Sequence, residues 1–268
     1  MTKYNYHTHT TFCDGSAPAE ALVQEALEKG FSVLGFSGHS PLDAGEDWYM
    51  TETGAGEYRR EIAALKEKYR GRIEILCGVE QDFFSEPPAE DYDFVIGSVH
   101  AVCKNGRRYS VDESPQATER ALREAYGGSF DALAEDYFAL VAQVCQKTRC
   151  DIIGHIDLVS KFCELGPYGE SERYLRCAEA AVQALLPYDR PFEINTGAMA
   201  RGYRTAPYPS PAIMEMIRRG GGSLIYSSDC HSLGYLDFGF EQALSYARAA
   251  GFSSLRRLDC DLPLPLDP

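Results

Sequence analysis

Short β-rich runs alternate with amphipathic helical stretches along the whole chain, and this alternation is the feature that most constrains the fold. Apolar residues recur at helical spacing within 58–69, 130–141 and 175–185. Strands that alternate with helices indicate a parallel sheet of the α/β class, either closed as a barrel or open and doubly wound. The predicted strands are Lys3–Tyr6, Ser32–Phe36, Ile73–Val79, Phe94–Val99, Asp151–Gly154, Pro191–Asn195 and Ser223–Tyr226.

Helix boundaries can be predicted at a few positions. Ser171 is a suitable N-cap for the helix over 175–185, and Pro187 marks its end. Pro18 is expected in the first turn of the first helix, and Gly30 follows the last periodic residue of that helix.

The length of the chain is consistent with one domain. A single β/α barrel has about 250 residues, and this chain has 268. The sequence shows no internal repeat, low-complexity tract or linker, and 44% of its residues are hydrophobic, which is enough for a core. We therefore expect residues 1–268 to form a single domain.

Charge and cysteine usage exclude several classes of protein. A net charge of −14 disfavours binding to nucleic acid or to an anionic membrane. The sequence contains no apolar run of about 18 residues that could span a membrane, and its polar start is not typical of a signal peptide. The nine cysteines include no CxxC pair, which favours reduced thiols in a cytoplasmic protein.

The histidines occupy related positions. All six lie at or just past the carboxyl end of a predicted strand, and Glu80 ends the third strand in the same way. Any one of them could be an ordinary hydrogen-bonded residue at a strand end, but six at the same edge make that explanation poor. Carboxyl ends of parallel strands form the functional edge of α/β folds, and imidazoles with carboxylates are ligands of Zn²⁺, Mn²⁺ or Fe²⁺. The histidines are His7, His9, His39, His100, His155 and His231.

Residue spacing adds geometry to this prediction. Residues two apart in a strand face the same side, so His7 and His9 can bind one ion together. Asp229 and His231 have the same spacing after the last predicted strand. Asp14 lies in the loop before the first helix, within reach of the same edge.

Six short motifs occur in order along the chain, and together they are specific. They are HTHT at 7–10, SGHS at 37–40, CGVE at 77–80, IGSVH at 96–100, GHID at 154–157 and SSDCH at 227–231. With these motifs the chain resembles the polymerase and histidinol phosphatase (PHP) superfamily, most closely its histidinol-phosphatase branch, from Tyr4 to about Leu244. The resemblance implies a distorted seven-stranded, TIM-like (βα)7 barrel with a metal site at the carboxyl ends of the strands.

The resemblance also implies a site for two to three divalent transition metals, Zn, Mn or Fe. The implied ligand groups are His7, His9, Glu80 and Asp229 for the first ion, Glu80, His100 and His155 for the second, and Asp14, His39 and His231 for the third. Asp157 is expected to orient one of the metal-binding imidazoles.

Such a site suits phosphate ester chemistry. Three divalent ions and three carboxylates leave a net positive charge, which attracts a phosphate dianion. Two bridged ions lower the pKa of a shared water, and the resulting hydroxide can attack phosphorus. Glu80 and Asp229 would contribute to catalysis through these ions.

Further residues are expected to contact the substrate. Lys161 and Arg201 resemble phosphate-contacting positions of the family, and Arg204 is an alternative to Arg201. Trp48 and Tyr49 follow His39 and could stack on an imidazole of the substrate, or could simply cover the top of the barrel. The stretch 104–113, also interpreted as a loop, could contribute to specificity.

These observations predict a metal-dependent phosphomonoesterase acting on a small-molecule phosphate ester. The resemblance implies histidinol-phosphatase, which converts L-histidinol phosphate to L-histidinol and phosphate in histidine biosynthesis. Other phosphatase substrates of the same superfamily stay open: phosphotyrosine, a nucleotide or a sugar phosphate. A nuclease-type PHP module and a non-catalytic metal-binding module are weaker alternatives, because the chain is acidic and its ligand set exceeds that of a structural zinc site.

Overall fold

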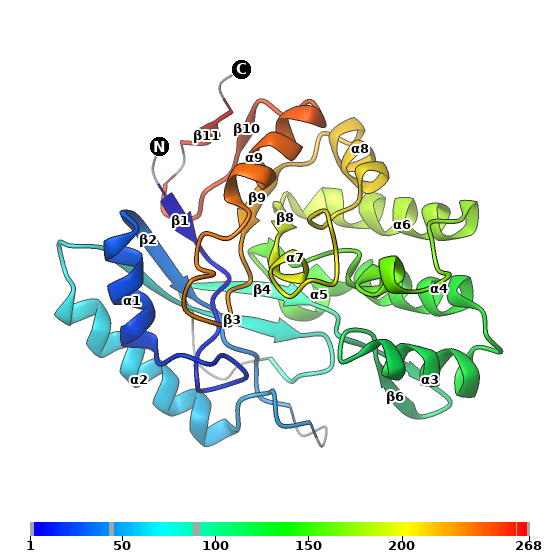
Figure 1. Ribbon diagram of the computed structural model, residues 1–268, viewed down its shortest axis with the longest axis horizontal. Coiled ribbons are helices and arrows are strands. Elements are labelled where there is room, and N and C mark those ends of the chain that lie inside the picture. The colour runs from blue at the N-terminus through cyan, green and yellow to red at the C-terminus, as the bar shows by residue number, and fades with distance from the viewer. Residues whose placement is uncertain (1–2, 43–45, 88–91, 261, 267–268) are drawn as a thin grey trace.

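A seven-stranded parallel sheet forms the centre of the protein, in the strand order β1-β2-β3-β4-β7-β8-β9 (Figure 1). This computed structural model describes residues 3–42, 46–87, 92–260 and 262–266. The strands are β1 Lys3–Asn5, β2 Phe31–Phe36, β3 Glu74–Asp82, β4 Phe94–Ser98, β7 Ile152–Ile153, β8 Phe192–Asn195 and β9 Leu224–Ser227. Each predicted strand is present, and the expected parallel α/β sheet is confirmed.

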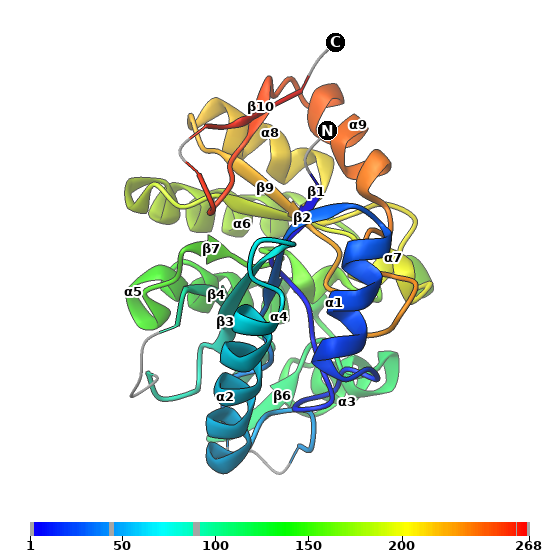
Figure 2. The same cartoon turned by 90° about the vertical axis from the view of Figure 1, so that its left-hand side faces the viewer.

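Helices pack along the outside of this sheet. Figures 1 and 2 show α1 and α2 beside β2 and β3, whereas α4 and α6 lie together on another side of the molecule. The helices are α1 Ala19–Glu28, α2 Glu52–Lys68, α3 Pro115–Ala125, α4 Phe130–Val141, α5 Val144–Thr148, α6 Glu172–Leu185, α7 Gly197–Ala200, α8 Pro211–Arg219 and α9 Phe240–Ala249. Short 3-10 turns are η1 Leu158–Ser160, η2 Cys163–Leu165 and η3 Leu186–Tyr188. Among the described residues, no helix is long and apolar enough to cross a membrane.

Most of the predicted helix boundaries are confirmed. Ser171 caps α6, because its side chain accepts a hydrogen bond from the Tyr174 amide at 3.0 Å. Pro187 lies in η3, directly after α6. Pro18 is the N-cap of α1 rather than a residue of its first turn, so that prediction was off by one position. Gly30 follows the helix with a φ of 73°, a conformation that glycine adopts without strain.

Two short antiparallel pairs lie outside the main sheet. The hairpin of β5 (Ala101–Lys104) and β6 (Arg107–Ser110) occupies much of the stretch that was interpreted as a loop, so that interpretation was wrong. Near the end of the chain, β10 (Ser254–Leu255) pairs with β11 (Leu264–Pro265).

Aromatic side chains pack closely against the strands of the sheet. The Phe94 ring packs over two glycines of neighbouring strands, and it meets the Tyr6 ring edge-on at 5.8 Å between centroids. A Cβ atom at Gly78 would lie only 2.3 Å from the Phe94 ring, and one at Gly35 would lie 2.9 Å from it. These glycines are therefore required for the close packing of a large core residue.

The first and last strands of the sheet approach each other. Just past their carboxyl ends, the His9 amide donates to the Cys230 carbonyl at 2.8 Å, and the Cys230 amide donates to the His7 carbonyl at 3.0 Å. At their amino ends, the C-terminal segment links them: the Tyr4 hydroxyl donates to the Arg256 carbonyl at 3.1 Å, and the Arg256 amide donates to the Leu224 carbonyl at 2.7 Å.

Candidate metal centre

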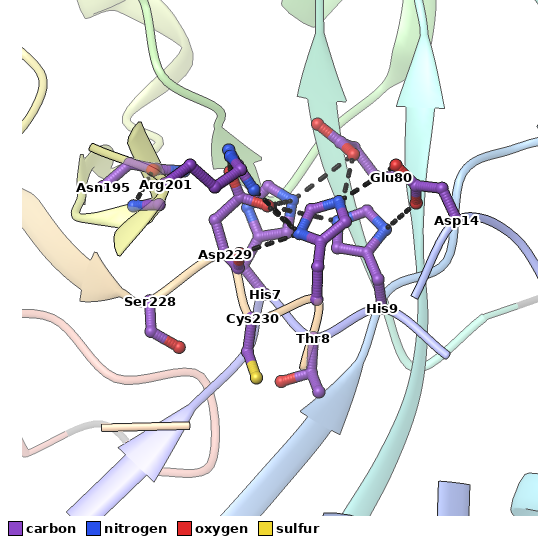
Figure 3. A network of polar contacts seen from close by, with 12 residues as sticks. His7, Thr8, His9, Asp14, Glu80, Asn195, Arg201, Ser228, Asp229 and Cys230 are labelled. Carbon is purple, nitrogen blue, oxygen red and sulfur yellow. Dashed lines mark hydrogen bonds and ion pairs between the residues drawn. The ribbon is translucent and has the colours of Figure 1, made fainter. Parts of the chain in front are cut away.

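All nine predicted metal ligands meet at the carboxyl edge of the sheet. Strand ends or the residues just after them supply eight of these side chains, and the loop before α1 supplies Asp14. Figure 3 shows His7 and His9 with Glu80, Asp14 and Asp229 around one centre. The imidazoles and Glu80 are almost completely buried, apart from His231, which lies at the rim with a side chain 20% exposed.

Glu80 lies in the middle of this cluster. Its Oε1 atom lies 3.1 Å from His100 Nε2 and 3.0 Å from His155 Nε2. Its Oε2 atom lies 2.9 Å from His39 Nδ1 and 3.3 Å from His7 Nε2. His9 Nε2 also lies 3.6 Å from Oε2, so each carboxylate oxygen faces a different set of imidazoles, as a bridging ligand would.

Asp229 and Asp14 provide the other carboxylates. Asp229 Oδ1 lies 3.3 Å from His9 Nε2 and 3.4 Å from His231 Nδ1. Asp14 Oδ2 lies 3.2 Å from His231 Nε2, and Asp14 Oδ1 lies 3.6 Å from His39 Nε2. The loop before α1 thus brings Asp14 to the same edge, as its position in the sequence suggested.

The unsatisfied polar atoms of this cluster fit a metal ion. Four buried atoms form no hydrogen bond, although a carboxylate oxygen or ring nitrogen lies nearby: His7 Nε2, His9 Nε2, His39 Nδ1 and Glu80 Oε2. Leaving such atoms without a partner is costly in a protein interior. Two ligands that each lie about 2.0–2.2 Å from a shared Zn²⁺ in tetrahedral geometry are about 3.3–3.6 Å apart, which is close to the separations seen between these groups.

The ligand atoms form four overlapping groups, each with all its atoms within 4.8 Å. All nine predicted ligands belong to at least one group. The arrangement differs in detail from the expected one, because His9 also joins the group around Asp14, and His100 and His155 meet Glu80 in separate groups. Among the described residues, the groups are His9, Asp14, His39 and His231; His7, His9 and Asp229; His7, Glu80 and His155; and His39, Glu80 and His100.

Two further carboxylates hold the imidazoles from behind. Glu193 Oε1 lies 2.6 Å from His7 Nδ1, and Asp82 Oδ2 lies 2.9 Å from His100 Nδ1. Carboxylates in this position fix the orientation and tautomer of a metal-binding histidine. Asp157, which was expected in this role, instead accepts a hydrogen bond from the Ser210 amide at 3.0 Å, so that expectation was wrong.

Sequence reasoning missed the role of both Asp82 and Glu193, although each left a signal. Asp82 lies two residues after Glu80 in β3, so the two carboxylates face the same side of the strand. Glu193 is a charged residue within the fully buried strand β8, where an unpaired carboxylate would be very costly.

Burial and neighbouring charges shift the pKa values of the ligands. Burial would raise the pKa of Glu80, but the nearby imidazoles, His100 first among them, outweigh it and hold that pKa well below its usual range. Burial, together with His231 and His39, lowers the pKa of His9 to about 3. An ionised Glu80 and a neutral His9 are the protonation states that bind a metal ion.

Of the three predicted phosphate-binding cations, two line the cavity above the cluster, which has a volume of about 270 Å³. Arg201 follows α7, and its guanidinium lies 3.0 Å from Asp229 Oδ2. Lys161 is nearly buried and donates to the Asp112 carbonyl at 2.8 Å. Arg204 is not among the cavity-lining residues: its guanidinium lies 4.4 Å from the centre of the Tyr208 ring.

The two predicted aromatic contacts differ in position. Trp48 lines the cavity, whereas Tyr49 is only 6% exposed and is not among the residues that line it. The Tyr49 ring stacks on Trp48, with 3.9 Å between centroids. Asp112 and Glu113, which end the stretch after β6, also line the cavity and give one part of it an acidic character.

A buried cluster of imidazoles and carboxylates, placed beside two cations at the carboxyl edge of a parallel α/β sheet, forms a candidate metal site suited to phosphate chemistry. Residues 5–197 match the PHP domain family, and the chain belongs to that family.

Individual relatives of this chain indicate a narrower group within the PHP family. The chain is 30% identical to the probable histidinol-phosphatase of Deinococcus radiodurans, over 91% of this chain and 92% of that protein. It is 27% identical to the histidinol-phosphatase of Bacillus subtilis, over 91% of this chain and 99% of that protein. Its fold is similar to the crystal structure of histidinol phosphate phosphatase from Lactococcus lactis subsp. lactis complexed with Zn, L-histidinol and phosphate, with a TM-score of 0.73 at 22% identity and coverage of 95% of each chain.

Proposed function

We propose that this protein is a metal-dependent phosphomonoesterase that hydrolyses L-histidinol phosphate to L-histidinol and phosphate, a reaction of histidine biosynthesis in the cytoplasm. The observation that carries the proposal is the convergence of all nine candidate ligands around Glu80 beside Arg201 and Lys161 in one cavity. The histidinol-phosphatase relatives support the choice of substrate.

The proposal includes a distorted (βα)7 barrel formed by residues 1–268 as one domain. Its support is the pair of hydrogen bonds that join the segments after β1 and β9, at His9 and Cys230 and at Cys230 and His7. The link from Tyr4 through Arg256 to Leu224 supports the same proposal at the opposite end of these strands.

The proposed cofactors are two to three divalent ions of Zn, Mn or Fe, and the four overlapping ligand groups support more than one ion. In the proposed assignment, Glu80 bridges two ions. Bound divalent ions would lower the pKa of a coordinated water and neutralise charge on the phosphoryl oxygens.

The protein's own side chains bind and orient the ester. Arg201 and Lys161 donate hydrogen bonds to the phosphoryl oxygens, and a planar guanidinium can do so through two parallel bonds. Asp229 holds the Arg201 guanidinium in place, with 3.0 Å between Oδ2 and Nη2. The backbone carbonyl of Asp112 holds the Lys161 amine in place by accepting a hydrogen bond from it at 2.8 Å.

The size of the cavity and the net charge of the whole chain favour a small substrate. A cavity of about 270 Å³ accommodates a small monoester, and a net charge of −14 on the whole chain disfavours a polyanionic nucleic acid. A phosphatase for phosphotyrosine, nucleotides or sugar phosphates would use the same metal cluster, so the substrate must be identified by comparison.

The test is the value of kcat/KM of metal-loaded protein for L-histidinol phosphate, phosphotyrosine, nucleoside monophosphates and sugar phosphates. We expect L-histidinol phosphate to be preferred at least about tenfold, which corresponds to about 1.4 kcal/mol of transition-state binding. A stronger preference for another ester would overturn the substrate assignment, and no hydrolysis of any ester would overturn the phosphatase assignment.

A further inference from the structure

Residues 48–50 cover one side of the metal cluster with aromatic rings. This segment contains Trp48, the chain's only tryptophan. The Trp48 ring lies edge-on to His39 and His100, with 4.9 Å and 5.4 Å between centroids. The Met50 amide donates to the His39 carbonyl at 3.3 Å, so the backbone of the segment is also attached beside a candidate ligand.

Tyr49 links this segment to the carboxylate behind His100. Its hydroxyl donates to Asp82 Oδ2 at 3.3 Å, and the same oxygen lies 2.9 Å from His100 Nδ1. Asp82 is 1% exposed, and its other oxygen accepts a hydrogen bond from the Phe84 amide at 2.7 Å. The carboxylate is therefore held from both sides, by the Tyr49 hydroxyl at the oxygen that faces His100 and by the Phe84 amide at the other oxygen.

Trp48 is suited to the leaving group rather than to the phosphate. An indole carries no positive charge with which to bind a dianion, whereas Arg201 and Lys161 line the same cavity. Aromatic faces bind planar rings and cationic groups. With the phosphoryl group held by the two cations, the rest of the ester is left to contact Trp48.

We propose that Tyr49 and Asp82 are positioning residues that connect Trp48 to the metal ligand His100. The face of the cavity formed by Trp48, which would contact the leaving group, is called the leaving-group wall. Tyr49 holds the Trp48 ring by stacking and the Asp82 carboxylate by its hydroxyl, so one side chain sets both the shape of the leaving-group wall and the direction of an imidazole. The choice of leaving group at Trp48 rests on the proposed function, but the connection to His100 does not.

The connection is tested by zinc affinity, measured without substrate by competition with a chelator. Tyr49→Phe keeps the stacked ring and removes only the hydroxyl, and we expect zinc affinity to fall about tenfold, as is usual when a group behind a ligand is lost. Asp82→Asn should lower it at least as much. Tyr69→Phe is the matched control, because it removes a hydroxyl that donates to another carboxylate, Glu20 Oε1 at 2.7 Å.

If Tyr49 acts by positioning a metal ligand, excess zinc should restore the activity of the variant. Tyr49→Phe should regain most of its kcat at saturating zinc, whereas a variant with a damaged fold would not. Zinc affinity equal to that of Tyr69→Phe would overturn the connection to His100.

The leaving-group wall has its own readout, because all tryptophan fluorescence of the protein comes from Trp48. Adding L-histidinol to zinc-loaded protein should change this fluorescence with a saturable dose dependence, and Tyr49→Phe should weaken the binding. An unchanged fluorescence would overturn the role of Trp48. This result is distinguishable from failure of the proposed function, which is decided by the substrate comparison.

Discussion

The two oxygens of Glu80 face five imidazoles that come from four different strand ends. A single carboxylate thus joins parts of the chain that are far apart in the sequence. It stays ionised because the surrounding imidazoles outweigh the effect of burial on its pKa. Arg201 and Lys161 line the same cavity as Glu80.

Replacing Arg201 should impair catalysis without unfolding the protein. The guanidinium lies at the cavity and its side chain is 30% exposed, so Arg201→Ala leaves little empty space. Because every monoester carries the same phosphoryl group, we expect kcat/KM to fall about 10²–10³-fold for all esters, the usual range for a lost transition-state donor. Steady-state kinetics across the ester panel measures this.

Arg204→Ala provides the contrast. Arg204 packs on the Tyr208 ring and donates to the Ser160 carbonyl at 3.3 Å, so its loss should reduce thermal stability more than activity. If Arg204→Ala loses activity on all esters and Arg201→Ala does not, the assignment of the phosphate contact is reversed.

The candidate metal ligands could be predicted from the sequence, but the carboxylates that hydrogen-bond to the imidazoles could not. His7, His9 and Glu80 could be found because strand ends meet at one edge and because the spacing in the chain fixes the side on which residues lie. The identity of the carboxylate behind each imidazole depends on side-chain directions across neighbouring strands, and local patterns do not contain this information. For this reason Asp157 was expected to orient one of the imidazoles, whereas in the structure Glu193 and Asp82 lie behind His7 and His100.

Among the secondary-structure elements, the seven sheet strands could be predicted, since buried parallel strands form continuous apolar runs. The β5–β6 hairpin was missed because each strand has only four residues and β6 is mostly polar. Its turn nevertheless carries a recognisable signal: Asn105 and Gly106 have φ values of 54° and 76°, as expected for an Asn-Gly hairpin turn.

Two ion pairs that share Asp237 link the segment before α9 to β1 and to the end of α1, and they should depend on pH. Asp237, just before α9, lies 3.0 Å from Lys3 of β1 and 2.5 Å from Lys29 at the end of α1. Partial burial would raise the pKa of Asp237, but the two lysines outweigh it, so its pKa is lowered in the folded state. A lowered carboxyl pKa stabilises the fold above the unfolded pKa of about 4, and this contribution is lost as the pH falls through the folded pKa.

Asp237→Asn should therefore destabilise the protein at pH 7 by about 1 kcal/mol or less, because these side chains are partly exposed and screened. The difference from the unmodified protein should disappear in strong acid and shrink at high salt. Urea unfolding at several pH values measures it, with Glu172→Gln as the control at a side chain that is 95% exposed. A difference that persists unchanged in acid would contradict the ionic explanation.

At the scale of the whole molecule, the C-terminal segment contributes to the core although the motifs end before it. Leu255 of β10 is 1% exposed, and the Tyr6 hydroxyl of the first strand segment donates to Asp259 at 2.5 Å. Figures 1 and 2 show β10 and β11 on the same side of the molecule as β1. The position of this segment could not be predicted, because its short strands carry little periodicity.

Leu255→Ala should lower the free energy of unfolding by about 2–5 kcal/mol, the usual cost of this change at a buried leucine. Leu262 lies in the same segment with 75% exposure, and Leu262→Ala should cost almost nothing. Denaturant unfolding of the two variants provides the comparison. Equal stability of the two would show that the C-terminal segment does not seal the core.

The hydrogen bonds between Cys230 and the His7–His9 segment have a consequence for the order of assembly. They join residues from opposite ends of the chain, and the same two segments carry His7, His9, Asp229 and His231. During synthesis, the first two histidines leave the ribosome long before their partners exist. The full cation site is therefore completed late in folding. A cation held between Asp229 and His7 would stabilise the contact between these two distant segments of the chain.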